Sequence, residues 1–216
     1  MNPSIKAVAF DVDGTLVDSS MWITLHRRFG FSPEDDARLL RLYHENKITF
    51  REWMDAVAEI YASMSPPLTK GEIEAIWKGF VFIPGAEGVV AELKKRYPIA
   101  LISSGFTDYV DPVAQALSVP HAYAFMRMRY REDGTYGGME YLSHGDELSA
   151  KVDALDDFAA KIGIEAHEIA FVGDSINDLG AFRHTGKGIL VGDGTPEMRE
   201  AAWKKVATLP EVLDIL

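Results

Sequence analysis

Cysteine is absent from the 216 residues of this chain. The protein therefore has no disulfide bonds, no thiolate metal ligands and no cysteine nucleophile. Long hydrophobic runs are lacking as well, since no apolar stretch reaches the roughly 18 residues that a membrane-spanning helix needs. The first six residues carry neither the positive region nor the apolar run of a signal peptide. These absences predict a cytoplasmic protein that does not enter a membrane.

Positive charge is scarce. The chain has 22 lysines and arginines against 33 aspartates and glutamates, a formal net charge of −11. This charge repels nucleic acids and anionic membrane surfaces, so neither is expected as a partner. It also repels a phosphorylated ligand, so a phosphate site here needs local positive charge from a cation, a lysine or backbone N–H groups. The six histidines show no zinc-type pairing and are interpreted as surface residues.

Strand-like and helix-like segments alternate over much of the chain. The apolar run 5–10 is typical of a strand buried on both faces, and the runs 99–102 and 169–172 are each followed by a turn and a helical pattern. This alternation predicts an α/β fold with a parallel sheet. Segment 123–141 alternates around a turn at Asp133-Gly134, which predicts a small antiparallel hairpin. The tail after 188–191 is expected to be helical.

Residues 18–80 show helical periodicity alone. Apolar residues recur there at helical spacing, and capping residues such as Ser32 and Thr69 mark helix starts. A chain of this length suits one core carrying a smaller insert. The segment is therefore predicted to be a small helical bundle.

Polar residues follow three of the predicted strands. Asp11 and Asp13 follow the first, residues 103–105 (Ser-Ser-Gly) the second, and residues 173–178 (Gly-Asp-Ser-Ile-Asn-Asp) the third. The carboxyl ends of parallel strands lie at one edge of a sheet, where ligands bind. We therefore expect these residues to meet at a single site.

The residue types at these strand ends suit phosphoryl transfer. Asp11 can attack phosphorus while Asp13 moves the proton of the leaving oxygen. Asp174 and Asp178 can complete an oxygen-rich Mg²⁺ site with Asp11 and a backbone carbonyl. Ser103 with the following N–H groups can cradle phosphoryl oxygens, and Lys151, at the start of its helix, can bridge nucleophile and phosphate. Each feature alone has a structural alternative, since Asp-x-Asp-Gly is common in turns and a single lysine is usually solvated, but their combination favours catalysis.

With these motifs the sequence resembles the haloacid dehalogenase superfamily phosphatases, and within them the phosphoserine phosphatase branch. The motifs are residues 11–15 (Asp-Val-Asp-Gly-Thr), Ser103, Lys151 and residues 173–178, and the resemblance covers nearly the whole chain. It implies a Rossmann-like core of residues 1–17 and 81–216, in which helices cover both faces of a parallel sheet. It also implies a helical cap, residues 18–80, inserted after the first strand.

The resemblance implies a role for each motif residue. Asp11 would be the nucleophile, Asp13 the general acid/base, and Asp174 the principal metal ligand of the last motif. The full expected set comprises the catalytic residues Asp11, Asp13, Ser103 and Lys151, the substrate-binding residues Ser104, Gly105 and Asn177, and the Mg²⁺-binding residues Asp11, Asp13, Asp174 and Asp178.

Two positions depart from the phosphoserine phosphatase pattern. Those enzymes hold the amino and carboxylate groups of their substrate with an acidic residue after the first motif and an arginine in the second cap helix. The comparable positions here are Ser20 and Val57, so the resemblance does not extend to phosphoserine as the substrate. Trp22 and Trp53 are interpreted as packing within the cap more often than as substrate contacts.

The expected function is a Mg²⁺-dependent phosphatase that hydrolyses a small phosphorylated metabolite, a phosphate monoester, through a phospho-aspartyl intermediate. A phosphotransferase or mutase on the same core is the alternative within enzymes. A non-catalytic binding module is the alternative outside them. Monomer and homodimer are both left open.

Overall fold

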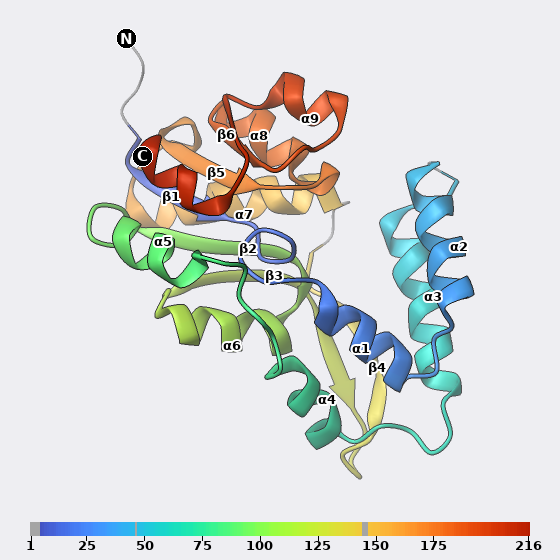
Figure 1. The fold of residues 1–216 in the computed structure, drawn as a ribbon. Coiled ribbons are helices and arrows are strands. Elements are labelled where there is room, and N and C mark those ends of the chain that lie inside the picture. The colour runs from blue at the N-terminus through green and yellow to red at the C-terminus, as the bar shows by residue number, and fades with distance from the viewer. Residues whose placement is uncertain (1–4, 46, 144–146) are drawn as a thin grey trace.

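The computed structural model describes residues 5–45, 47–143 and 147–216 (Figure 1). Seven strands form one sheet in the order β4-β3-β2-β1-β5-β6-β7. Strand β1 (Ala7–Phe10) lies at its centre and pairs in parallel with β2 (Ile99–Phe106) and β5 (Ile169–Gly173). Within the described residues every strand pair is parallel except β3 with β4. The predicted α/β fold is confirmed.

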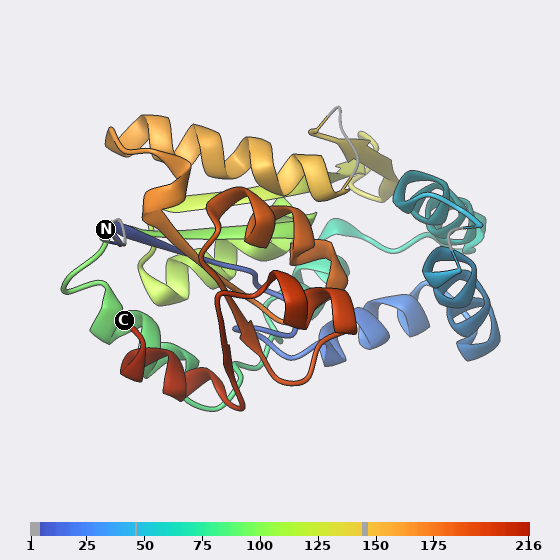
Figure 2. The same cartoon turned by 90° about the horizontal axis from the view of Figure 1, so that it is seen from above.

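Helices cover both faces of the sheet, because the side chains of β1 alternate between two buried layers. Val8 and Phe10 face the layer that contains α5 (Ala86–Leu93) and α6 (Thr107–Leu117), whereas Ala7 and Ala9 face the other layer. That second layer contains the remaining core helices, which are α7 (Glu147–Ile162), α8 (Leu179–Thr185) and α9 (Pro196–Ala201). Figure 2 shows the two layers from above. Among the described helices none is long and apolar enough to cross a membrane.

The segment after β1 is helical, as predicted. It contains α1 (Ser20–Arg28), α2 (Pro33–His44), α3 (Phe50–Ser63) and α4 (Lys70–Trp77). The chain leaves and re-enters the core at one place, because the Asp18 N–H donates to the Val81 carbonyl at 3.0 Å and the Ile83 N–H donates to the Leu16 carbonyl at 2.9 Å. Helices α2 and α3 project from the rest of the molecule as an antiparallel pair (Figure 1).

The predicted antiparallel hairpin is confirmed and consists of β3 (His121–Tyr130) and β4 (Tyr136–Tyr141). Strand β3 continues the main sheet by pairing with β2, and the far end of the hairpin packs on the helical insert. The Tyr136 ring lies 4.9 Å from Phe29 and 5.9 Å from Tyr61, and the Tyr136 N–H donates to the Leu68 carbonyl. The hairpin therefore connects the insert to the sheet through contacts between residues distant in sequence.

Three element boundaries also differ from the predictions. The tail is not wholly helical, because β7 (Lys204–Val206) pairs in parallel with β6 (Gly188–Val191), and three residues are too few for a visible periodicity. Helix α7 begins at Glu147, so Lys151 lies inside the helix and does not open it. Strand β2 extends to Phe106 and so includes Ser103, with an irregular register beyond that residue.

Candidate active site

The first aspartate follows β1 directly. The Asp11 N–H donates to the Val172 carbonyl of β5 at 2.9 Å, and the Asp11 side chain is buried, with 2% of the residue exposed. Gly14 turns the chain away with a φ of +85°, and a Cβ there would lie 2.5 Å from a carboxylate oxygen of Asp174. Glycine is therefore required both for the turn and for the approach of the two motifs.

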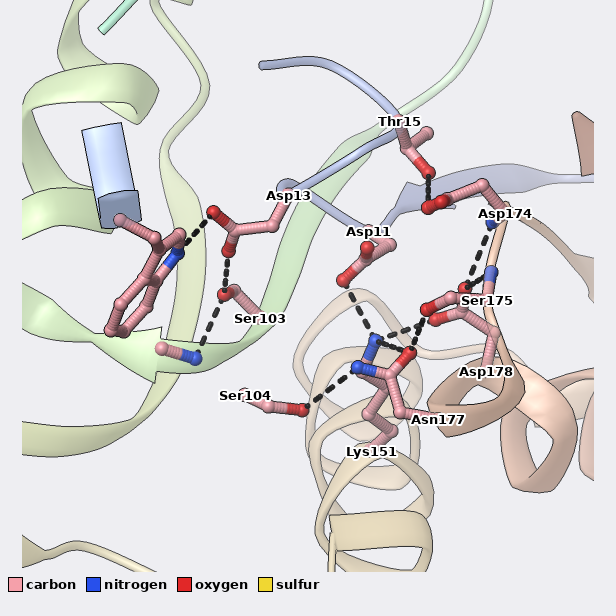
Figure 3. Close-up of polar contacts among 12 residues, drawn as sticks. Asp11, Asp13, Thr15, Ser103, Ser104, Lys151, Asp174, Ser175, Asn177 and Asp178 are labelled. Carbon is pink, nitrogen blue, oxygen red and sulfur yellow. Dashed lines mark hydrogen bonds and ion pairs between the residues drawn. The ribbon is translucent and has the colours of Figure 1, made fainter. Parts of the chain in front are cut away.

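Lys151 reaches the site from α7 and is fully buried. Its Nζ lies 2.7 Å from Asp11 Oδ1 and 2.5 Å from Asp178 Oδ1, and it donates to Asn177 Oδ1 at 3.3 Å (Figure 3). Burial lowers the pKa of Lys151, but the charges of Asp11 and Asp178 more than offset burial, so the pKa lies above its usual value. The ammonium is thus a permanent positive charge beside Asp11.

Asp178 uses both of its carboxylate oxygens within the protein. Oδ1 contacts Lys151, and Oδ2 accepts hydrogen bonds from the N–H groups of Asp174 and Ser175 at 3.0 and 3.1 Å. Asn177 is held nearby, since the Ser175 hydroxyl donates to its Oδ1 at 2.7 Å. The segment 173–178 therefore folds around Asp178, which holds the Lys151 ammonium in place.

Asp13 points away from Asp174 and toward the helical insert. The Trp22 indole N–H donates to Asp13 Oδ1 at 2.7 Å, and the Ser103 hydroxyl donates to Oδ2 at 3.1 Å. Ser103 is oriented in turn by the Gly105 N–H, which donates to its hydroxyl at 2.9 Å. Burial raises the pKa of Asp13, and the hydrogen bonds from Trp22 and Ser103 oppose that rise. A carboxyl group in this environment is suited to carry and release a proton.

Three carboxylates form a group that fits a divalent cation. Asp11, Asp174 and Asp178 each offer an oxygen, and these atoms lie within 4.8 Å of one another. Burial, with the Asp178 charge added, raises the pKa of Asp174 to about 6, and burial likewise raises the pKa of Asp11 well above its usual range. The Thr15 hydroxyl orients Asp174 by donating to its Oδ1 at 2.8 Å. Crowded oxygen donors of this kind suit Mg²⁺, which would relieve their mutual repulsion.

A cavity of about 430 Å³ is lined by Asp11 and Asp13 on the core side and by residues of the helical insert on the other. The predicted residues Asp11, Asp13, Ser104, Gly105 and Asn177 line its inner end. The opposite walls come from the insert and consist mainly of aromatic and aliphatic side chains, including Trp22, Ile23, Leu40, Tyr43, Phe50 and Trp53.

Several sequence interpretations change at this cavity. Trp22 and Trp53 line it, so they are not confined to cap packing, and His26 lines it as a half-buried residue, not as a surface histidine. Val57 is buried in the insert with 1% of the residue exposed and does not line the cavity. Of Ser20 only the backbone, at the start of α1, is described.

Sequence reasoning did not identify Thr15, Asp36, Tyr43 or Phe50 as site residues. Asp36 and Tyr43 stand on one face of α2 at positions i and i+7, with Leu40 between them at i+4. That spacing was visible in the sequence. The sequence did not show that this face of α2 lines the cavity, because helical periodicity does not indicate what a helix packs against.

The family model of haloacid dehalogenase-like hydrolases matches residues 8–183. The phosphoserine phosphatase of Methanocaldococcus jannaschii is 28% identical over 189 residues, which cover 86% of this chain and 85% of that protein. The phosphoserine phosphatase of Lactococcus lactis is 24% identical over 185 residues, 84% of this chain and 81% of that protein.

Solved structures agree with these relatives. A phosphoserine phosphatase described as a phospho-aspartyl intermediate analogue has a TM-score of 0.81 with this chain at 25% identity, and the match covers 99% of each chain. A substrate-bound phosphoserine phosphatase complex gives the same values. The predicted family and enzyme class are confirmed by these matches. The chain belongs to the haloacid dehalogenase-like hydrolases, in which it is similar to the phosphoserine phosphatase branch.

Proposed function

We propose that this protein is a Mg²⁺-dependent phosphatase that hydrolyses a small-molecule phosphate monoester through a phospho-aspartyl intermediate on Asp11. The observation that carries the proposal is the position of Asp11, held by Lys151 at the inner end of the cavity and adjacent to Asp174 and Asp13. The similarity to a phosphoserine phosphatase trapped as an analogue of that intermediate supports it.

In the first step an oxygen of the Asp11 carboxylate attacks phosphorus, and the bond from phosphorus to the alcohol oxygen breaks. Asp13 donates its proton to the leaving alcohol oxygen. The Lys151 ammonium offsets the negative charge on the transferred group, and the hydroxyl of Ser104, which lines the cavity, donates to it. When bound, Mg²⁺ supplies further positive charge at the same place.

In the second step Asp13, now ionised, takes a proton from the water molecule that attacks the phosphoryl group. Phosphate leaves and the Asp11 carboxylate is restored, so the proton lent to the alcohol is regained from water. Trp22 and Ser103 hold Asp13 in place for both transfers.

We assign the metal to Asp11 and Asp174, each of which retains an oxygen without a hydrogen bond among the described residues. Asp178 instead anchors Lys151, because both of its oxygens are occupied. The Asp13 carboxylate lies outside the metal group, which leaves its main-chain carbonyl for that role.

We further propose that residues 18–80 act as a cap on the core of residues 1–17 and 81–216. The walls of the cavity that face the carboxylates come from α1, α2 and α3. Closing such a cap would exclude bulk water from the phospho-enzyme and select the alcohol half of the substrate.

Asp11→Asn tests the proposal. We expect it to abolish Mg²⁺-dependent release of phosphate from an aryl phosphate, because the amide oxygen is a poor nucleophile. Asp157→Asn, at an exposed site of α7, is the matched control and should retain activity. Full activity of Asp11→Asn with a native circular dichroism spectrum would refute the assignment.

Product analysis separates the alternatives. A phosphotransferase or mutase would convert the substrate into a phosphorylated acceptor, whereas a phosphatase releases free phosphate in equal amount to the alcohol. A binding module would bind phosphate esters without turning over any of them.

A further inference from the structure

The charged groups that line the cavity are acidic. They are Asp11, Asp13 and Asp36, and among the described residues no lysine or arginine side chain lines the cavity. Asp11 is balanced by Lys151, and Asp13 accepts hydrogen bonds from Trp22 and Ser103. Asp36 differs, because within the described part of the chain its half-buried carboxylate has no hydrogen bond or ion pair.

Among the described residues, neither His26 nor the arginines Arg28 and Arg51 neutralise Asp36. Burial lowers the pKa of His26, although the Asp36 charge opposes this, and the His26 Nδ1 lies 2.9 Å from the Tyr61 hydroxyl. The imidazole is therefore uncharged at neutral pH. Arg28 pairs with Glu72 at 2.8 Å, and the Arg51 guanidinium lies 3.8 Å from the centre of the Tyr141 ring.

Aromatic rings dominate the walls on the insert. Trp53 is at the centre of three contacting rings, with centroid distances of 5.1 Å to Tyr43 and 6.2 Å to Phe50, and Trp22 lies on α1 next to Asp13. The faces of such rings carry partial negative charge and attract organic cations, and quaternary ammonium groups are bound by aromatic residues in this way.

We infer that the alcohol half of the substrate carries a quaternary ammonium group and no carboxylate, so that the substrate is a phosphorylated choline-type amino alcohol. This inference rests on the proposed phosphatase function. The aromatic walls would hold the cation and Asp36 would balance its charge. A substrate carboxylate would meet Asp36 and aromatic faces, and no cationic side chain among the described lining residues would pair with it.

Three phosphate esters test the inference on the Mg²⁺-loaded enzyme. Phosphocholine carries the ammonium, 3,3-dimethylbutyl phosphate is its uncharged isostere, and phosphoserine carries a carboxylate. We expect kcat/KM for phosphocholine to exceed that for the isostere by about tenfold, the range expected for a cation among aromatic faces, and to exceed that for phosphoserine by more. An isostere hydrolysed as well as phosphocholine would show an apolar site, and a preference for phosphoserine would show an amino-acid site; either result overturns the inference.

Two variants test whether Asp36 recognises the ammonium charge of the substrate. Asp36→Asn should lower the ratio of kcat/KM for phosphocholine and its isostere severalfold, and the preference that remains should be the part supplied by the aromatic faces. Glu34→Gln, an exposed position on the same helix that does not line the cavity, is the matched control and should keep the wild-type ratio. An unchanged ratio in Asp36→Asn would remove Asp36 from the recognition of the cation.

Hydrolysis of an aryl phosphate, which has no ammonium group, distinguishes a failure of this inference from a failure of the proposed phosphatase function. Hydrolysis of the aryl phosphate without a preference for phosphocholine would refute the substrate class alone. Absence of hydrolysis of all four esters by folded, Mg²⁺-loaded protein would refute the proposed function and the inference with it.

Discussion

Two carboxylates of the same motif, Asp174 and Asp178, meet opposite environments. Asp178 is fully buried and receives two N–H groups and the Lys151 ammonium, so its negative charge is stabilised. Among the described residues, Asp174 accepts a side-chain hydrogen bond from the Thr15 hydroxyl alone, and burial raises its pKa to about 6. Asp178 therefore stabilises the metal-free site, whereas Asp174 destabilises it.

Opposite effects on stability should follow from removing these charges. We expect Asp178→Asn to lower the free energy of unfolding by about 3 kcal/mol, because it leaves the buried Lys151 short of one partner. Asp174→Asn should leave the metal-free protein as stable as the wild type or more so at pH 7.5. Urea unfolding in EDTA measures both, and equal losses in the two variants would contradict the distinction.

At the scale of elements, the ends of three strands carry the site. Strand β5 ends at Gly173, where a Cβ would overlap the carboxylate of Asp178. Helix α7 delivers Lys151 from one face of the sheet, and α1 delivers Trp22 from the insert. Small residues at the strand ends allow these side chains to meet.

Gly173→Ala should therefore disturb the site although it changes no polar group. The added methyl group displaces Asp178 from Lys151 and from its backbone donors, so we expect kcat to fall at least about tenfold and the free energy of unfolding to fall by about 2 kcal/mol. Gly88→Ala in α5 is the control, because nothing lies within 4 Å of its added Cβ. Steady-state kinetics and urea unfolding decide the matter; wild-type behaviour of Gly173→Ala would mean that Asp178 has room to move.

At the scale of the whole molecule, negative charge and stability are linked through the site. The formal charge of −11 is widely spread, but the raised pKa values of Asp11, Asp13 and Asp174 all occur in one buried place. Ionising these groups opposes folding when no cation is bound.

The metal-free protein should consequently lose stability as the pH rises from 5 to 7. The pKa of Asp174 is about 6 in the folded chain, above its usual value of 3.8, so its contribution is complete below about pH 4 and is lost as the pH rises through 6. Burial lowers the pKa of His26, which acts in the opposite direction. His26 is present in both the wild type and Asp174→Asn, so comparing the two proteins cancels the contribution of His26.

Thermal or urea unfolding in EDTA measures the difference. Between pH 5 and 7, the free energy of unfolding of the wild type should fall by about 1 kcal/mol relative to that of Asp174→Asn. Saturating Mg²⁺ should reverse the trend, since the cation binds the ionised carboxylates of the folded chain. A difference between the two proteins that stays constant with pH would show that Asp174 is already ionised at pH 5.

The sequence by itself determined the order of strands and helices as far as β6, the helical insert and the residues at the strand ends. These features are local: a buried strand, a helical period or a capping residue shows in a few neighbouring letters, and parallel strands bring their carboxyl ends together. Asp11, Asp13, Ser103 and Lys151 could thus be named together. Their roles, the cap boundaries and the metal ligands remain predictions.

Only the tertiary structure decided what surrounds those residues. Strand β7 and the contact of Tyr136 with Phe29 and Tyr61 depend on pairing between distant segments. Local periodicity contains no information on such pairing. The Trp22 hydrogen bond to Asp13 and the place of Asp36 in the cavity depend likewise on how the insert folds over the core. The reaction chemistry could be predicted from the sequence because each motif is a short contiguous segment. Substrate selectivity depends on side chains from distant segments, which only folding brings to the site.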